Sequence, residues 1–197
     1  MIRLILVLSF VASTNAVPTR CCLDQRFTAI MTDVRSVTKG IYVYDAMSMD
    51  FDLKLKVRTT LSFNPGQRTV GPTTGYRQIQ DFNTKKEYSI TPHGCKVSDL
   101  VVDLQGPCVP DNAEYLGSNY FGYGVSSLKF DAYRYPLEKT GANATIMFTQ
   151  GDCIPVLEAV SDVINGVAVD STSIFSTYEK GIQDRSIFNI PSRCSHH

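Results

Sequence analysis

A strict alternation of apolar and polar residues extends from Phe51 to Phe63. One face of this stretch is polar or charged, and the other consists mainly of large apolar side chains: Phe51, Leu53, Leu55, Val57, Thr59, Leu61 and Phe63. A period of two is the pattern of a strand that buries one face and exposes the other to water. The sequence therefore predicts a long, half-buried strand with its charged face in solvent.

Shorter stretches with strand-forming composition recur along the chain. They are Ile41 to Tyr44, Tyr88 to Ile90, Leu128 to Tyr133, Thr145 to Thr149 and Val167 to Val169. Turn residues separate such runs at Asn64-Pro65-Gly66, Thr140-Gly141 and Asn165-Gly166. The last pair lies between apolar runs and suits a type I′ hairpin, so the pattern predicts an antiparallel meander.

The segment from Ile154 to Val163 fits two structures equally well. Its spacing allows a helix, whereas Pro155 and three valines favour a strand. Both interpretations stay open from the sequence.

The first residues have the composition of a secretory signal peptide. Arg3 precedes an apolar run from Leu4 to Ala12, and small residues at Thr14-Asn15-Ala16 form a cleavage site. The apolar run is too short to cross a bilayer, which takes about 20 residues. We therefore predict removal of residues 1–16, a single domain over 17–197, secretion, and no membrane span.

Export places the six cysteines in an oxidising environment, where they are expected to form three disulfides. The neighbours Cys21 and Cys22 should bond elsewhere, because adjacent Cα atoms lie about 3.8 Å apart and a disulfide prefers at least about 4.4 Å. Spacing alone selects none of the remaining pairings. No CxxC motif or Cys/His pair at ligand spacing indicates zinc.

Charge and motifs argue against several classes of function. The 19 basic and 19 acidic residues are mixed, without the basic stripe of a nucleic-acid binder. His93 is isolated between Pro92 and Gly94, and no hydrolase or protease motif accompanies it, so an enzyme is not expected. The stretch from Gly122 to Ser126 lacks the lysine of a phosphate-binding loop and is interpreted as a flexible aromatic turn.

Two sites of other kinds are suggested by composition. Asp45, Asp50 and Asp52 could contribute scattered calcium ligands, although they do not form an EF-hand loop and solvated strand charges explain them equally well. Asn143-Ala-Thr145 is an acceptor for N-glycosylation.

Aromatic residues are concentrated between Tyr115 and Tyr135. They suit a packed core and sheet surface, or the wall of a cavity for an apolar ligand, and both interpretations stay open.

The last stretch, Gly181 to Cys194, has no regular period but contains Ile182, Ile187 and Phe188. Chain ends are usually disordered unless something holds them. We therefore predict that Cys194 is bonded to a distant cysteine, with Phe188 packed beneath the segment. Asp184 is interpreted as a turn or capping residue.

Taken together, these motifs resemble the ependymin-related family of secreted proteins, on its invertebrate side. The resemblance is carried by the Cys21-Cys22 doublet, Tyr44-Asp45, Gly94-Cys95-Lys96, Cys108-Val-Pro-Asp-Asn-Ala113, Leu116-Gly117, Asp152-Cys153-Ile-Pro-Val156, Gly181-Ile-Gln-Asp184, Phe188 and Pro191-Ser-Arg-Cys194.

The resemblance implies a mainly β fold of two stacked, curved antiparallel sheets that form a half-open barrel with a hydrophobic pocket, similar to bacterial lipoprotein carriers. It implies the disulfides Cys95–Cys194, Cys22–Cys153 and Cys21–Cys108. It further implies a homodimer, glycosylation, calcium binding and contact with the extracellular matrix. The pocket is expected to be lined by Leu55, Val57, Phe130 and Phe148.

Two functions follow from these expectations. The first is a secreted glycoprotein that binds lipid-like molecules, with calcium as a further ligand. The second is a structural component of an extracellular or mineral-associated matrix, or of cell-matrix adhesion, without a small-molecule ligand.

Overall fold

The computed structural model describes residues 20–35, 42–64, 69–137, 141–164 and 167–194. These residues contain the strands β1 (Arg26–Arg35), β2 (Tyr42–Asp50), β3 (Leu55–Asn64), β4 (Thr69–Asp81), β5 (Lys86–Thr91), β6 (Gly94–Asp99), β7 (Glu114–Phe121), β8 (Leu128–Pro136), β9 (Asn143–Thr149), β10 (Pro155–Ile164) and β11 (Val167–Lys180). The described part also contains short 3-10 helices, η2 (Gly124–Ser126), η3 (Arg185–Phe188) and η4 (Ser192–Cys194).

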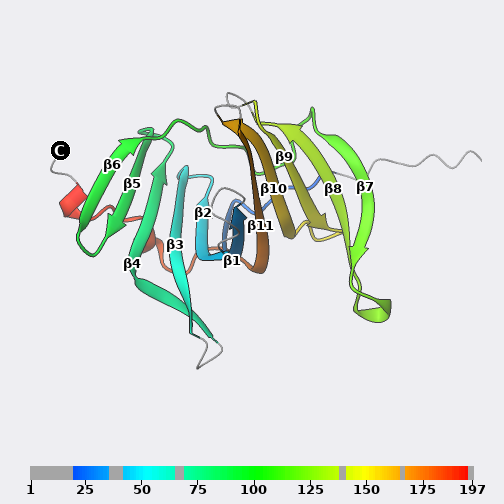
Figure 1. Cartoon of the computed structure of the whole chain (residues 1–197), viewed down its shortest axis with the longest axis horizontal. Coiled ribbons are helices and arrows are strands. Elements are labelled where there is room, and N and C mark those ends of the chain that lie inside the picture. Colours follow the sequence, from blue (N-terminus) through cyan, green and yellow to red (C-terminus); the bar gives the residue numbers. More distant parts are fainter. Residues whose placement is uncertain (1–19, 36–41, 65–68, 138–140, 165–166, 195–197) are drawn as a thin grey trace, which may run out of the picture.

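All the strands belong to one antiparallel sheet, in the order β6-β5-β4-β3-β2-β1-β11-β10-β9-β8-β7 (Figure 1). Two meanders, β1 to β6 and β7 to β11, are joined where β1 pairs with β11. The outermost strands β6 and β7 do not pair with each other, so the sheet is not closed. The predicted mainly β, half-open architecture is confirmed, and its two layers are halves of a continuous sheet.

The sheet curls so that one face of each half lines a common interior. Cluster residues from β1 and β2, among them Phe27 and Met47, pack on one side of this interior. Tyr135, Ile146 and Phe148 of β8 and β9 pack on the other side. The segment between β6 and β7, residues 100–113, runs from one edge of the sheet to the other and is called the crossing segment below (Figure 1).

Strand β3 begins later than predicted, and neither of its faces is open to solvent as expected. Residues 51–54 form a turn, because the Asp50 carboxylate accepts a hydrogen bond from the Leu53 amide at 2.9 Å and Lys54 has a φ of 53°. The prediction that the strand starts at Phe51 is therefore wrong. The expected solvated face is also wrong, since Lys56 and Arg58 line the interior.

The segment from Ile154 to Val163, for which the sequence allowed a helix or a strand, forms the strand β10, with Pro155 as its first residue. Proline is tolerated at that position because a strand's first amide need not join the ladder. The predicted turn Asn165-Gly166 lies outside the described residues, as do Pro65-Gly66 and Thr140. The pairing of Ile164 with Val167 nevertheless places β10 and β11 in a hairpin.

The C-terminal segment crosses the outer face of β3, β4 and β5. Phe188 is 6% exposed and packs against Val57, Ile79 and Ile90. The segment ends at Cys194, which forms a disulfide with Cys95 of β6. At its start, the Asp184 carboxylate caps η3 by accepting a hydrogen bond from the Ser186 amide.

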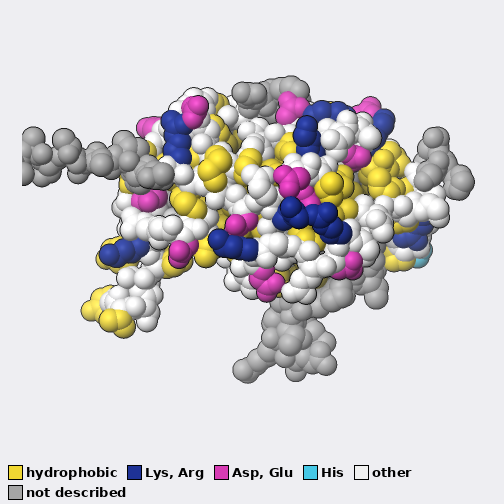
Figure 2. All heavy atoms as spheres, turned by 180° about the vertical axis from the view of Figure 1, so that it is seen from behind, with side chains coloured by type: hydrophobic (Ala, Val, Ile, Leu, Met, Phe, Trp, Pro, Cys, Tyr) yellow, Lys and Arg dark blue, Asp and Glu magenta, His cyan; other side chains and the backbone are white. Residues whose placement is uncertain are grey.

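The surface mixes charges of both signs, and an apolar tip projects from it. Basic and acidic side chains lie among one another on the face shown in Figure 2. The connection between β7 and β8 projects from the molecule and carries apolar side chains (Figure 2). Tyr123 is almost fully exposed in this connection and Val125 is fully exposed. The aromatic turn predicted from Gly122 to Ser126 is part of this tip.

Candidate functional site

A cavity of about 250 Å³ lies inside the curled sheet. Side chains from strands of both halves line it, together with the segment of residues 102–109 between β6 and β7. Most of its wall is apolar: Leu23, Phe27, Met31, Met47, Met49, Phe51, Phe82, Val102, Leu104, Pro107, Val109, Tyr135, Ile146, Phe148 and Phe175.

Three methionines, Met31, Met47 and Met49, form part of the apolar wall. Each is buried, with an exposed fraction of 6% or less. They alternate with other residues on β1 and β2, as expected for one face of a strand. Because methionine is flexible and unbranched, this wall can adjust to ligands of different shape.

A buried ion group supports the polar end of the cavity. The Arg58 guanidinium donates hydrogen bonds to the carboxylates of both Asp33 and Asp45. Asp45 also accepts a hydrogen bond from Thr60 at 3.0 Å, and Asp33 accepts one from Ser173 at 2.6 Å. Burial alone would lower the pKa of Arg58, but the two carboxylates outweigh it and raise that pKa. The arginine is therefore permanently charged.

Lys56 adds an amine to the same wall. Burial lowers the pKa of Lys56, and the nearby charge of Arg58 lowers it further. Glu158 acts in the opposite direction on this pKa, although β10 and β3 are separated in the sheet by three strands. Within the described part of the chain, no hydrogen bond or ion pair engages the Lys56 amine.

The predicted pocket residues do not come together. Phe148 lines the cavity, whereas Leu55 and Val57 lie on the outer face of β3, beneath the C-terminal segment. Phe130 stacks on Phe121 near the end of β7, with ring centroids 4.6 Å apart. The placement of three of the four residues in the pocket is therefore corrected. The alternation along β3 identified its two faces, but not which of them turns inward.

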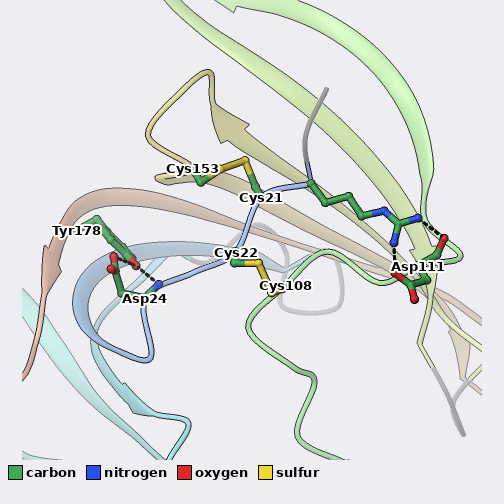
Figure 3. The surroundings of a disulfide bond; sticks show 8 residues. Cys21, Cys22, Asp24, Cys108, Asp111, Cys153 and Tyr178 are labelled. Atoms are coloured by element: carbon green, nitrogen blue, oxygen red, sulfur yellow. Dashed lines mark hydrogen bonds and ion pairs between the residues drawn. A yellow bond between two sulfur atoms is a disulfide. The ribbon is translucent and has the colours of Figure 1, made fainter. Parts of the chain in front are cut away.

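The pairing of the cysteine doublet is also corrected. Cys21 is bonded to Cys153, and Cys22 to Cys108 (Figure 3). Successive side chains of an extended chain point in opposite directions. Cys21, 4% exposed, points into the core beside the β9–β10 turn, so Cys22 faces the crossing segment that contains Cys108.

The N-terminal residues fasten the crossing segment by further contacts. The Leu23 amide donates a hydrogen bond to the Pro107 carbonyl at 2.8 Å, and the Val109 amide donates one to the Cys21 carbonyl at 2.9 Å. Next to them, the Tyr178 hydroxyl donates a hydrogen bond to the Asp24 carboxylate at 2.9 Å (Figure 3). This side of the cavity is thus held by covalent and hydrogen bonds.

The three aspartates considered for calcium are engaged by arginines. Asp45 is bonded to Arg58, and Asp52 lies 3.3 Å from Arg26. Asp50 is fully buried, with Arg26 at 4.0 Å and the C-terminal segment's Arg185 at 3.7 Å from its carboxylate. Asp45 and Asp50 are therefore not solvated charges. The described residues contain no group of three or more His, Cys, Asp or Glu side chains placed to hold a metal ion.

The remaining candidates lie at the surface. Asn143 is the first residue of β9 and is exposed, and His93 is exposed in the turn between β5 and β6. No helix among the described residues is long and apolar enough to cross a membrane.

Fold and site together define a half-open antiparallel β protein with an interior cavity, fastened by three disulfides. The sequence model of the Ependymin family matches residues 71–194, which is more than half of the chain. The protein belongs to the ependymin family.

Two relatives from the abalone Haliotis asinina match over most of their length. Ependymin-related protein 1 is 26% identical over 191 residues, covering 89% of this chain and 90% of the relative. Ependymin-related protein 2 is 26% identical over 211 residues, covering 98% of each.

Solved structures similar to this chain have low sequence identity to it. An uncharacterised conserved protein from Thermus thermophilus has a TM-score of 0.51 at 8% identity, covering 87% of this chain and 89% of that one. A LolA superfamily protein from Nitrosomonas europaea has a TM-score of 0.40 at 7% identity, covering 85% and 91% respectively. The first of these supports the fold assignment alone.

Proposed function

We propose that the protein binds small, lipid-like molecules in its interior cavity and acts outside the cell. The observation that carries this proposal is the cavity of about 250 Å³ with a mostly apolar wall. Ligand pockets are typically about 300 to 1,000 Å³, apolar, with a few polar groups. The cavity is close to the lower end of that range and fits one small amphiphile better than a large lipid.

An interior space of this size is unusual for a core whose only task is stability. Protein interiors are packed as densely as organic crystals, and voids larger than a water molecule are few. Here both halves of the sheet contribute side chains around the same space, and the crossing segment covers part of it. A flexible methionine wall would allow different apolar tails to enter.

The extracellular location rests on the covalent structure. All six cysteines are paired, and disulfides persist in oxidising compartments. The predicted signal peptide agrees with this location, and exposed Asn143 would be accessible for glycosylation. The buried, arginine-bonded aspartates give no support to a calcium site.

A neutral fluorescent probe tests the proposal. N-phenylnaphthylamine should bind the secreted protein with one site, because its uncharged rings match the apolar wall. Met47→Trp should weaken binding at least about tenfold, or about 1.4 kcal/mol, by filling the space. Met47 is 6% exposed and lines the cavity, whereas Val125 is fully exposed at the β7–β8 tip, so Val125→Trp is the matched control.

Native mass spectrometry of the purified protein should in addition show a co-purified apolar molecule. If neither the probe nor any extracted lipid binds, the cavity is not a ligand site. The structural matrix component would then be the better description.

A further inference from the structure

The polar end of the cavity has a balance of charges that restricts the head group of a ligand. The cavity is lined by Lys56, Arg58 and Glu158. Arg58 is hydrogen-bonded to the carboxylates of Asp33 and Asp45. Arg58 carries one positive charge and its two carboxylate partners carry two negative charges. The charge of Arg58 is therefore already engaged by two carboxylates of the protein.

Lys56 and Glu158 are charged groups of this end that no hydrogen bond or ion pair among the described residues engages. They belong to β3 and β10, which are not neighbours in the sheet, and the curl brings both to one space. Burial has the larger effect and lowers the pKa of Lys56, while the charge of Glu158 acts in the opposite direction on that pKa. Their hydrogen-bonding capacities are complementary, an amine that donates and a carboxylate that accepts.

Charged head groups are disfavoured here. A ligand carboxylate would approach the Glu158 carboxylate, while an ammonium would approach the cations Lys56 and Arg58. Either ion would also lose its hydration, which is costly in a buried site without a full set of partners.

A hydroxyl group meets both requirements without a net charge. It accepts a hydrogen bond from an amine and donates one to a carboxylate, which is the pair of partners that Lys56 and Glu158 present. The apolar wall next to them, with Phe27, Met31 and Phe175, would hold a hydrocarbon tail.

We propose that the cavity selects uncharged amphiphiles with a hydroxyl-bearing head, and that Lys56 and Glu158 are the residues that set this preference. The inference rests on the proposed function and deepens it, since it concerns the chemical class of the ligand in the same cavity.

Competition with one chain length and three head groups tests the inference. Decanol, decanoate and decylamine should each be titrated against bound N-phenylnaphthylamine at neutral pH. Decanol should displace the probe at about a tenfold lower concentration than either charged analogue, or about 1.4 kcal/mol. Equal or stronger displacement by decanoate or decylamine would overturn the inference, as would failure of all three to displace the probe.

Charge variants give a second, independent readout. Glu158→Gln should shift the ranking toward decanoate, and Lys56→Met should shift it toward decylamine. Exposed Glu114→Gln and Lys129→Met should leave the ranking unchanged. An unchanged ranking in both cavity variants would contradict the assigned roles. Absence of probe binding to the wild type would instead contradict the proposed function.

Discussion

At the residue scale, the interior depends on Arg58, because two buried carboxylates share its charge. Asp33 and Asp45 are 3% and 4% exposed, and each is bonded to the guanidinium. Burying an ion pair contributes little by itself, since desolvation offsets the attraction. Removing one partner has a much larger effect, because the remaining charges stay buried without compensation.

Arg58→Met should therefore lower the free energy of unfolding by about 3 to 5 kcal/mol. Chemical denaturation measures this change directly. Lys86→Met is the control, because Lys86 pairs with Asp99 in water at the sheet edge, and exposed ion pairs contribute little. A variant of Arg58 that unfolds at the wild-type denaturant concentration would contradict the role of the ion group.

At the element scale, the C-terminal segment supplies the cover that lets β3 bury both faces. The sequence predicted from its three apolar residues and its cysteine that this segment is held. It did not show that the segment covers the apolar face of β3, since that contact joins residues about 130 positions apart, such as Val57 and Phe188. Local periodicity identifies residues that share a face, but the cover of that face is a tertiary property.

The same limit explains the other differences. The strands β3, β8 and β9 and the β10–β11 hairpin were predicted because their signals are local, in the alternation and the turn residues. The strands β1, β4, β6 and β7 lie outside every predicted run. The partners of Cys21 and Cys22 depend on which of the two side chains points toward the core. The spacing of the cysteines carries no information about that direction. Lys56 and Glu158 share a cavity only because the sheet curls.

Phe188→Ala tests the cover. Removing a buried phenylalanine side chain leaves a cavity against Val57, Ile79 and Ile90, and should lower the free energy of unfolding by about 3 to 5 kcal/mol. Ile190→Ala is a matched control on the same segment, because Ile190 is 37% exposed. Equal losses for both variants, measured by denaturant unfolding, would argue against packing at Phe188.

At the scale of the whole molecule, two disulfides of similar span have different tasks. Cys95–Cys194 closes 99 residues and fixes the outer cover, whereas Cys22–Cys108 closes 86 residues and fixes the segment over the cavity. The entropy of loop closure in the unfolded chain grows slowly with length, so their effects on stability should be similar, typically about 2 to 4 kcal/mol each.

Removing each bridge by paired serine substitutions should separate the two tasks. Both variants should lose similar stability in denaturant, but only Cys22→Ser with Cys108→Ser should weaken N-phenylnaphthylamine binding, because residues 102–109 line the cavity. Unchanged probe affinity in that variant would show that the crossing segment is not needed to shape the site.

The central position of the β1–β11 pair has a consequence for how the chain folds. Strands from the two ends of the chain meet in the middle of the sheet, while consecutive strands β6 and β7 lie at its opposite edges. A circular permutant that starts at β7 and joins β11 to β1 would run through the same sheet as one uninterrupted up-and-down meander. The natural order makes the middle pairing the most non-local contact. Such contacts carry a high closure entropy and slow folding, so the two halves can form early but become one sheet only when the chain ends meet.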